Sequence, residues 1–198
     1  MHVSQRYLDL TQQKLQLARL PREPPAFTQG YGVRRAELEP LLDFWLESYD
    51  CRAQEEMYNN RLPQYRTNIT YIQKPHHEAT SLRVHFVHRK STFANAVPLL
   101  VCHDWGSSFI EVSKMIDTLC EPISTPPLGN VDVQAFHVVC PSIPGFGFSD
   151  ASPNEAFGLQ GTAEVFRLLM ERLGYERFLL HGSGWYVLVG NALEAPNR

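Results

Sequence analysis

The sequence has 198 residues, 18 of them Lys or Arg and 21 Asp or Glu, which gives a formal net charge of −3. Hydrophobic residues make up 43% and charged residues 20%, proportions that exclude wholesale disorder and allow one sizeable core. The near-neutral balance argues against nucleic acid as a partner. The most apolar stretch, 96–102, contains Pro98 and is too short to cross a bilayer. No apolar stretch near the N-terminus indicates a secretory signal, so we expect a cytoplasmic protein.

Helices are predicted in the first third of the chain. A loose amphipathic pattern predicts a first helix that ends before Pro21, because the residue before a proline disfavours the helical conformation. A connector rich in proline and glycine follows, over residues 21–32. A second helix is predicted over 38–59. Its apolar side chains recur at three- and four-residue steps and should pack as one stripe on a core: Leu41, Leu42, Trp45 and Tyr49.

Strands and helices alternate after Pro63, which predicts an α/β fold with a mainly parallel sheet and helices on both faces. Strands are predicted at 67–73, 81–88, 98–103, 135–140 and 178–181. Helices are predicted at 107–119, capped by Ser107 or Ser108, at 157–173, ended by Gly174, and from 182 onward. The pair His76-His77 has no third ligand nearby, so we expect a solvated turn rather than a metal site.

The cysteines Cys51, Cys102, Cys120 and Cys140 lack the CxxC spacing of a zinc site. Cys102 and Cys140 lie in apolar runs, as small core residues do in a reducing compartment. We therefore expect no metal and no cofactor.

Three turns follow the apolar strands: His103-Asp104-Trp105-Gly106, residues 144–150, and residues 182–186. Ligands of parallel sheets bind at the carboxyl ends of the strands, which is where all three turns lie. The third turn has the strand-turn-helix context of a nucleophile elbow, with a small residue on each side of the nucleophile. Gly182 takes the first small position, Gly184 the nucleophile position and Tyr186 the last small position. A glycine has no side chain that could attack a substrate.

The sequence resembles the microsomal-type epoxide hydrolases, which have an α/β-hydrolase fold preceded by an N-terminal epoxide hydrolase region. The resemblance covers almost the whole chain and rests on several groups of residues. They are Leu17-Ala18-Arg19-Leu20-Pro21, Tyr31-Gly32-Val33, Phe44-Trp45, Tyr49-Asp50-Cys51-Arg52, Leu62-Pro63-Gln64-Tyr65, residues 84–88, Pro98-Leu99-Leu100, residues 103–107, residues 136–150, residues 163–166 and Arg172-Leu173-Gly174-Tyr175-Glu176.

The resemblance implies a two-step mechanism. An aspartate on the elbow opens the epoxide and forms an alkyl-enzyme ester, and a histidine oriented by an acid activates water to hydrolyse it. The resemblance assigns the oxyanion-hole N–H groups to Trp105 and Trp185. It implies substrate contacts at His103, Asp104, Trp105 and Trp185, and tyrosine donors to the epoxide oxygen from a cap domain.

This sequence departs from that pattern at several positions. The aspartate position is Gly184, and the family's His-Gly-x-Pro turn has Asp104 and Gly106 in place of glycine and proline. The cap tyrosines, the acid and the catalytic histidine would follow Arg198, and the last histidine here is His181. Ser183 lies one step before the elbow apex. Asp104 could reach the same cleft from its neighbouring turn.

We therefore expect an incomplete α/β-hydrolase, with residues 1–66 as the epoxide hydrolase N-terminal region and 67–198 as the first half of the core. By resemblance it is an epoxide hydrolase, and by its residues it is catalytically inactive. The alternatives are a non-catalytic module that binds a small molecule or a protein partner, and a fragment of a longer gene product. An open sheet edge at 178–181, beside exposed Val187, Leu188 and Leu193, would favour a homo-oligomer or association with another chain.

Overall fold

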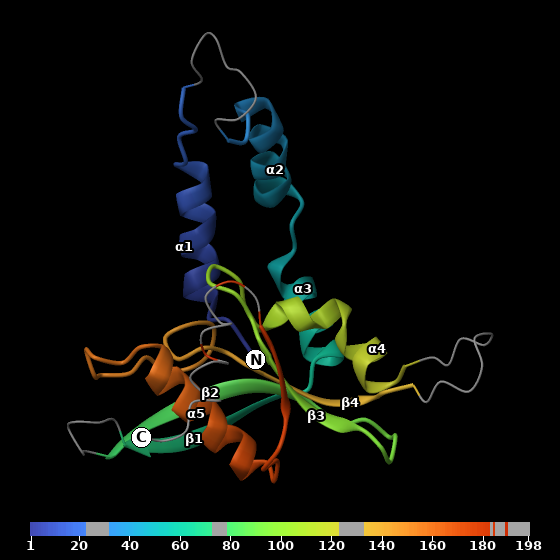
Figure 1. The fold of residues 1–198 in the computed structure, drawn as a ribbon. Coiled ribbons are helices and arrows are strands. Elements are labelled where there is room, and N and C mark those ends of the chain that lie inside the picture. Colours follow the sequence, from blue (N-terminus) through green and yellow to red (C-terminus); the bar gives the residue numbers. More distant parts are fainter. Residues whose placement is uncertain (23–31, 73–78, 123–132, 183, 185–188, 190–198) are drawn as a thin grey trace. The chain divides into compact units, whose positions relative to one another are not determined.

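A computed structural model describes residues 1–22, 32–72, 79–122, 133–182, 184 and 189 (Figure 1). Its helices are α1 (Gln5–Gln16), α2 (Arg35–Glu47), α3 (Cys51–Arg61), the 3-10 helix η1 (Phe109–Lys114), α4 (Ile116–Cys120) and α5 (Leu159–Arg172). Its strands are β1 (Gln64–Ile72), β2 (Ala79–Arg89), β3 (Val97–Cys102), β4 (Phe136–Pro141) and β5 (Leu179–Gly182). Most of the predicted connector, the turn at His76-His77, the helix after Gly182 and the apolar Val187, Leu188 and Leu193 lie outside the described residues. The chain divides into two compact units, Met1–Met57 and Tyr58–Arg198.

The first unit contains α1, α2 and most of α3. The prediction of one helix over 38–59 was wrong, because the chain forms two helices separated at 48–50. The Asp50 carboxylate accepts hydrogen bonds from the Arg52 N–H at 2.8 Å and the Ala53 N–H at 3.0 Å. It thereby satisfies two of the free donors at the start of α3 and begins a new helix there.

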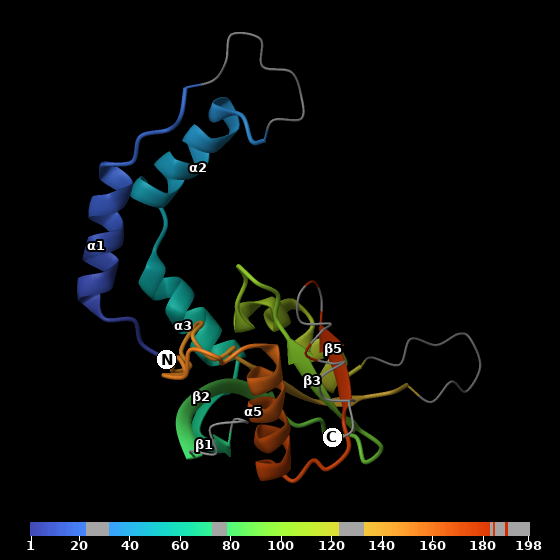
Figure 2. The same cartoon turned by 60° about the vertical axis from the view of Figure 1, so that its left-hand side comes forward.

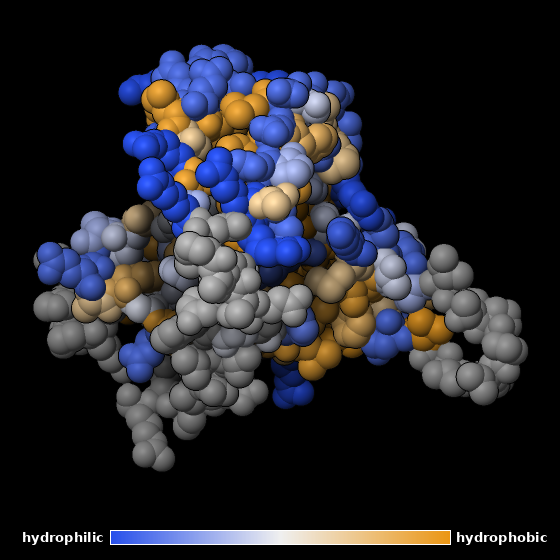
Figure 3. Space-filling view, turned by 90° about the horizontal axis from the view of Figure 1, so that it is seen from above, coloured by the Kyte–Doolittle hydropathy of each residue, from blue (hydrophilic) through white to orange (hydrophobic). Residues whose placement is uncertain are grey.

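The apolar stripe of α2 is not buried on a core, which corrects the expectation from its spacing. None of the residues of α1, α2 or α3 is fully buried, and Leu41 is 63% exposed. The helices α1 and α2 contact each other. Figure 3 shows hydrophobic side chains at the molecular surface among hydrophilic ones.

The second unit is built on a five-stranded mixed sheet with the order β1-β2-β4-β3-β5. The strand β2 pairs antiparallel with β1 and with β4, whereas β3 lies parallel between β4 and β5. One hydrophobic cluster joins one face of the sheet to α5, and a second joins the other face to η1 and α4 (Figures 1 and 2). Helices therefore cover both faces, as the alternating pattern predicts.

The segment 107–119 was predicted as one helix and instead forms η1 followed by the short α4. A 3-10 helix has three residues per turn, so residues three apart lie above one another. Phe109 and Val112 have this spacing and are both buried in the second cluster. The predicted cap is confirmed at Ser108, whose hydroxyl accepts a hydrogen bond from the Ile110 N–H at 3.3 Å. Gly174 follows α5 with a φ of 86°, as expected of a residue that ends a helix.

Candidate functional site

The turns after β3, β4 and β5 lie side by side at the carboxyl ends of these strands, because the three strands are parallel to one another. The structure brings the turn that begins at His103 against both of its neighbours. The Ile143 N–H donates to His103 Nε2 at 3.3 Å, and the Asp104 carboxylate lies against Gly184. The sequence-predicted residues His103, Asp104 and Gly184 are therefore close together in space.

The His103 side chain connects two of these turns. Its side chain is buried, and because Nε2 accepts a hydrogen bond, Nδ1 carries the proton and donates to the Asp104 carbonyl oxygen at 3.1 Å. Burial lowers the pKa of His103, although the bond to Asp104 opposes the shift. The neutral imidazole thus links the turn after β3 to the turn after β4.

The Asp104 carboxylate fills the space in front of Gly184. Gly184 has a φ of 57°, and a Cβ atom added to it would lie 2.3 Å and 2.4 Å from the two Asp104 carboxylate oxygens and 2.6 Å from their carbon. Such distances are far inside van der Waals contact, so no side chain fits at position 184 while Asp104 keeps this position. A side chain at 184 would therefore require the Asp104 carboxylate to move.

The same carboxylate engages a backbone donor. The Trp105 N–H donates to Asp104 Oδ1 at 2.7 Å. This N–H is the group that the family resemblance assigns to the oxyanion hole. The Trp105 side chain is 69% exposed and points away from the core. Trp185, the other expected donor, lies outside the described residues, as do Ser183 and Tyr186.

Gly106 gives the turn a path that the family's proline could not follow. Its φ is 82°, whereas the proline ring holds φ near −65°. A proline at position 106 could therefore not keep this path of the backbone.

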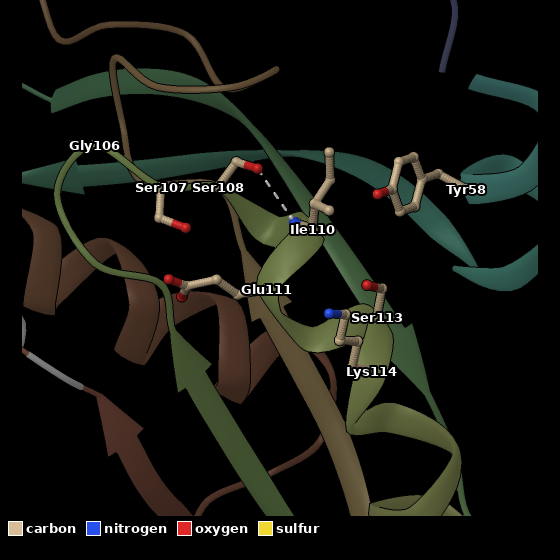
Figure 4. Close-up of a pocket in the computed structure, with 8 residues that line it drawn as sticks. All are labelled: Tyr58, Gly106, Ser107, Ser108, Ile110, Glu111, Ser113 and Lys114. Carbon is tan, nitrogen blue, oxygen red and sulfur yellow. Dashed lines mark hydrogen bonds between the residues drawn. The ribbon is translucent and has the colours of Figure 1, made fainter. Parts of the chain in front are cut away.

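A pocket with a volume of about 510 Å³ lies beside this turn (Figure 4). It is lined by Tyr58 of α3, by Gly106, Ser107 and Ser108, and by Ile110, Glu111, Ser113 and Lys114 of η1. In Figure 4 the Glu111 side chain extends toward Ser107. Glu111 also accepts a hydrogen bond from the Asp104 N–H, at 3.3 Å. Glu111 and Lys114 could not be predicted as pocket residues from the sequence, because neither belongs to a motif and both join the pocket only through the fold of η1.

No group of three or more His, Cys, Asp or Glu side chains that could hold a metal ion occurs within the described ranges. Cys102 and Cys140 are buried, and burial raises the pKa of the Cys102 thiol to about 12 and that of Cys140 further still. Both thiols are therefore protonated and unreactive at neutral pH. Among the helices that the structure describes, none is long and apolar enough to cross a membrane.

The chain is similar in sequence to epoxide hydrolases over most of its length. The family model "Epoxide hydrolase N terminus" matches residues 1–112. A putative epoxide hydrolase of Stigmatella aurantiaca is 35% identical over 191 residues, which are 96% of this chain and 40% of the relative. Epoxide hydrolase 1 of Oryctolagus cuniculus is 36% identical over 163 residues, covering 80% of this chain and 33% of the relative.

Solved structures of epoxide hydrolases are also similar to this chain. The juvenile hormone epoxide hydrolase of the silkworm Bombyx mori superposes with a TM-score of 0.74 at 28% identity, over 98% of this chain and 47% of that one. The epoxide hydrolase of Aspergillus niger superposes with a TM-score of 0.76 at 27% identity and the same coverage. The chain has part of the α/β-hydrolase fold. It belongs to the epoxide hydrolase family and spans less than half the length of these relatives.

Proposed function

We propose that this chain is a non-catalytic member of the epoxide hydrolase family. Its relatives are named for the hydrolysis of epoxides, and the reaction that the resemblance implies begins with a carboxylate on the elbow. The observation that carries the proposal is the pair Asp104 and Gly184. The elbow position has no side chain, and the Asp104 carboxylate fills the volume where one would begin.

Under this proposal, the Asp104 carboxylate does not replace the elbow aspartate as the nucleophile. Its Oδ1 accepts the Trp105 N–H at 2.7 Å, so one carboxylate oxygen and one backbone donor satisfy each other. That hydrogen bond engages a lone pair of Oδ1 and makes this oxygen a weaker nucleophile. His103, the nearest imidazole, has both ring nitrogens in hydrogen bonds to backbone groups and is buried. It is therefore poorly placed to activate a water molecule.

The test is diol formation from a reactive epoxide such as styrene oxide. We expect no diol above the background of a heat-denatured sample, and no mass increase of the intact chain. Catalytic diol production by the unmodified chain would overturn the proposal. Loss of that production in Asp104→Asn would then identify Asp104 as a replacement nucleophile.

A second candidate function is the binding of a small molecule without turnover, which the pocket of about 510 Å³ favours. Pockets of this size accept small ligands, and this one has a carboxylate, an ammonium group and serine hydroxyls on its wall. Saturation-transfer NMR with styrene oxide and its diol tests this function, with Ser107→Leu as the variant that narrows the pocket. A signal that is equal in the variant would place the ligand elsewhere.

We also propose that the protein is cytoplasmic and has no nucleic-acid partner. Any small molecule that it binds would be an epoxide. Copies of the chain would associate through the edge strand of the sheet. All four cysteines are free, which supports a reducing compartment. The edge strand β5 has alternately exposed residues, which supports association.

A further inference from the structure

A depression of about 450 Å³ on the second unit has three arginines in its wall and no acidic residue. Its lining is Arg66, Thr67 and Asn68 of β1, Arg83 of β2 and Arg172, the last residue of α5. The chain as a whole carries a net charge of −3, so this concentration of positive charge is local. None of the residues that line it belongs to the turns after β3 and β5, and the chemistry of the depression is independent of epoxide hydrolysis.

The three guanidinium groups are held in place mostly by uncharged contacts. Arg172 Nη1 donates to the Thr67 hydroxyl at 3.0 Å and also to the Asn68 carbonyl oxygen. The Arg66 guanidinium carbon lies 5.9 Å from the centre of the Phe148 ring, a cation–π contact. These contacts orient the side chains and leave their positive charge unneutralised.

Only one carboxylate balances this charge in the part of the chain that the structure describes. Arg83 pairs with Asp150 at 3.1 Å, while Arg66 and Arg172 have no carboxylate within ion-pair distance there. The nearby acidic residues of α5, Glu164 and Glu171, are both paired with Arg167. Three guanidinium groups against one carboxylate leave two positive charges in excess at the depression.

We propose that this depression binds a phosphate group, carried either by a phosphorylated small molecule or by the headgroup of an anionic lipid. Guanidinium groups present planar N–H forks that match phosphate oxygens, and a dianion would neutralise the excess charge. Both contacts of Arg172 use Nη1, so within the described residues its Nη2 and Nε remain available to a ligand. Thr67 and Asn68 also line the depression, along the outer side of β1.

Calorimetric titration of the full chain with pyrophosphate at low ionic strength tests the proposal. We expect saturable binding that weakens as salt is added, because the attraction is between exposed charges. Arg66→Gln and Arg172→Gln should each weaken binding about tenfold or more, the loss of a charge-assisted hydrogen bond. The affinity of Arg66→Lys should lie between those of the unmodified chain and Arg66→Gln, because lysine keeps the charge and lacks the paired N–H groups of the guanidinium.

Arg177→Gln is the matched control, because it removes one positive charge from the same unit outside the depression. Circular dichroism of each variant checks that the fold is kept. Absence of pyrophosphate and vesicle binding, or equal weakening by Arg177→Gln and Arg66→Gln, would overturn the proposal.

Sedimentation with vesicles distinguishes the two sources of the phosphate group. One set of vesicles contains phosphatidylcholine alone, and the other adds phosphatidic acid. Co-sedimentation with the second set only, lost in Arg66→Gln and Arg172→Gln and competed by pyrophosphate, would identify a lipid headgroup. Pyrophosphate binding without co-sedimentation would identify a soluble ligand.

Discussion

At the scale of single residues, positions 104 and 184 act as one unit. Gly184→Asp alone would place two carboxylates in one volume and a side chain at a positive φ, so we expect it to lower the free energy of unfolding by about 1–3 kcal/mol. Asp104→Gly combined with Gly184→Asp should recover most of this loss, because it removes the overlap. Urea unfolding of the two single variants and the double variant measures the coupling.

Neither variant is expected to turn over an epoxide. Gly184→Asp places at 184 the residue that the family resemblance implies there. No described residue is placed to act as the base that would hydrolyse the ester, so the most this variant could do is become alkylated. Intact-mass spectrometry with styrene oxide would detect that adduct as a mass increase that the unmodified chain does not show. Equal unfolding free energies for the single and double variants would contradict the shared volume. Diol production by Gly184→Asp would show that a base exists among His103, His137 and His181.

A buried histidine gives a second prediction at this scale. His85 Nδ1 accepts the Ser142 hydroxyl at 2.8 Å, and Nε2 donates to the Gln64 side-chain oxygen at 3.1 Å. Burial, with a smaller contribution from the Arg66 charge, lowers the pKa of His85 to about 4. In the unfolded chain the value returns to about 6.5.

Between these values the unfolded chain binds more protons than the folded one, so stability is complete above about pH 6.5 and falls as the pH drops toward about 4. Burial lowers the pKa of His88 to about 4 as well, and it acts in the same direction. Urea unfolding at several pH values measures the slope. His85→Gln should flatten it relative to the unmodified chain, and an unchanged slope in that variant would contradict the assignment.

At the scale of elements, the start of α3 depends on a single carboxylate. Asp50→Ala removes the acceptor for two N–H groups and should lower the free energy of unfolding by about 1 kcal/mol. Hydrogen exchange should then accelerate in residues 51–61. Asp43→Ala, which removes an exposed carboxylate inside α2, is the control. Equal acceleration in both variants would mean that Asp50 does not cap the helix.

The strands of the second unit could be predicted because β1 and β2 alternate apolar and polar residues, and β3, β4 and β5 are short apolar runs followed by turn residues. The break between α2 and α3 could not, because the apolar spacing continues from Leu41 to Tyr49 across it and only Asp50 marks a new start. The position of Gly184 just after a strand that runs parallel to β3 could be predicted from the order of strand, small residues and turn, and its place on a nucleophile elbow stays a prediction. The contact with Asp104 could not, because it joins two turns that meet only when β3 and β5 pair.

At the scale of the whole molecule, exposed apolar side chains and an open strand predict association. The strand β5 pairs with β3 on one side only in the described sheet, and Leu179 is 52% exposed on it. The first unit adds exposed apolar side chains, among them Phe44 and Trp45. Unpaired strand edges and apolar patches both favour contact between chains.

We therefore expect oligomers in size-exclusion chromatography with light scattering at micromolar concentration. Leu179→Lys places a charge on the edge strand and should shift the distribution toward the monomer. Arg177→Lys, a substitution just before the same strand that keeps the charge, should leave it unchanged. A stable monomer of the unmodified chain under these conditions would contradict the prediction.

The contact between Asp104 and Gly184 also makes the two positions epistatic. A side chain at 184 requires either that the Asp104 carboxylate turns away or that residue 104 changes as well. The cost of a substitution at 184 therefore depends on the residue that stands at 104, although the two belong to different turns and are far apart in the sequence.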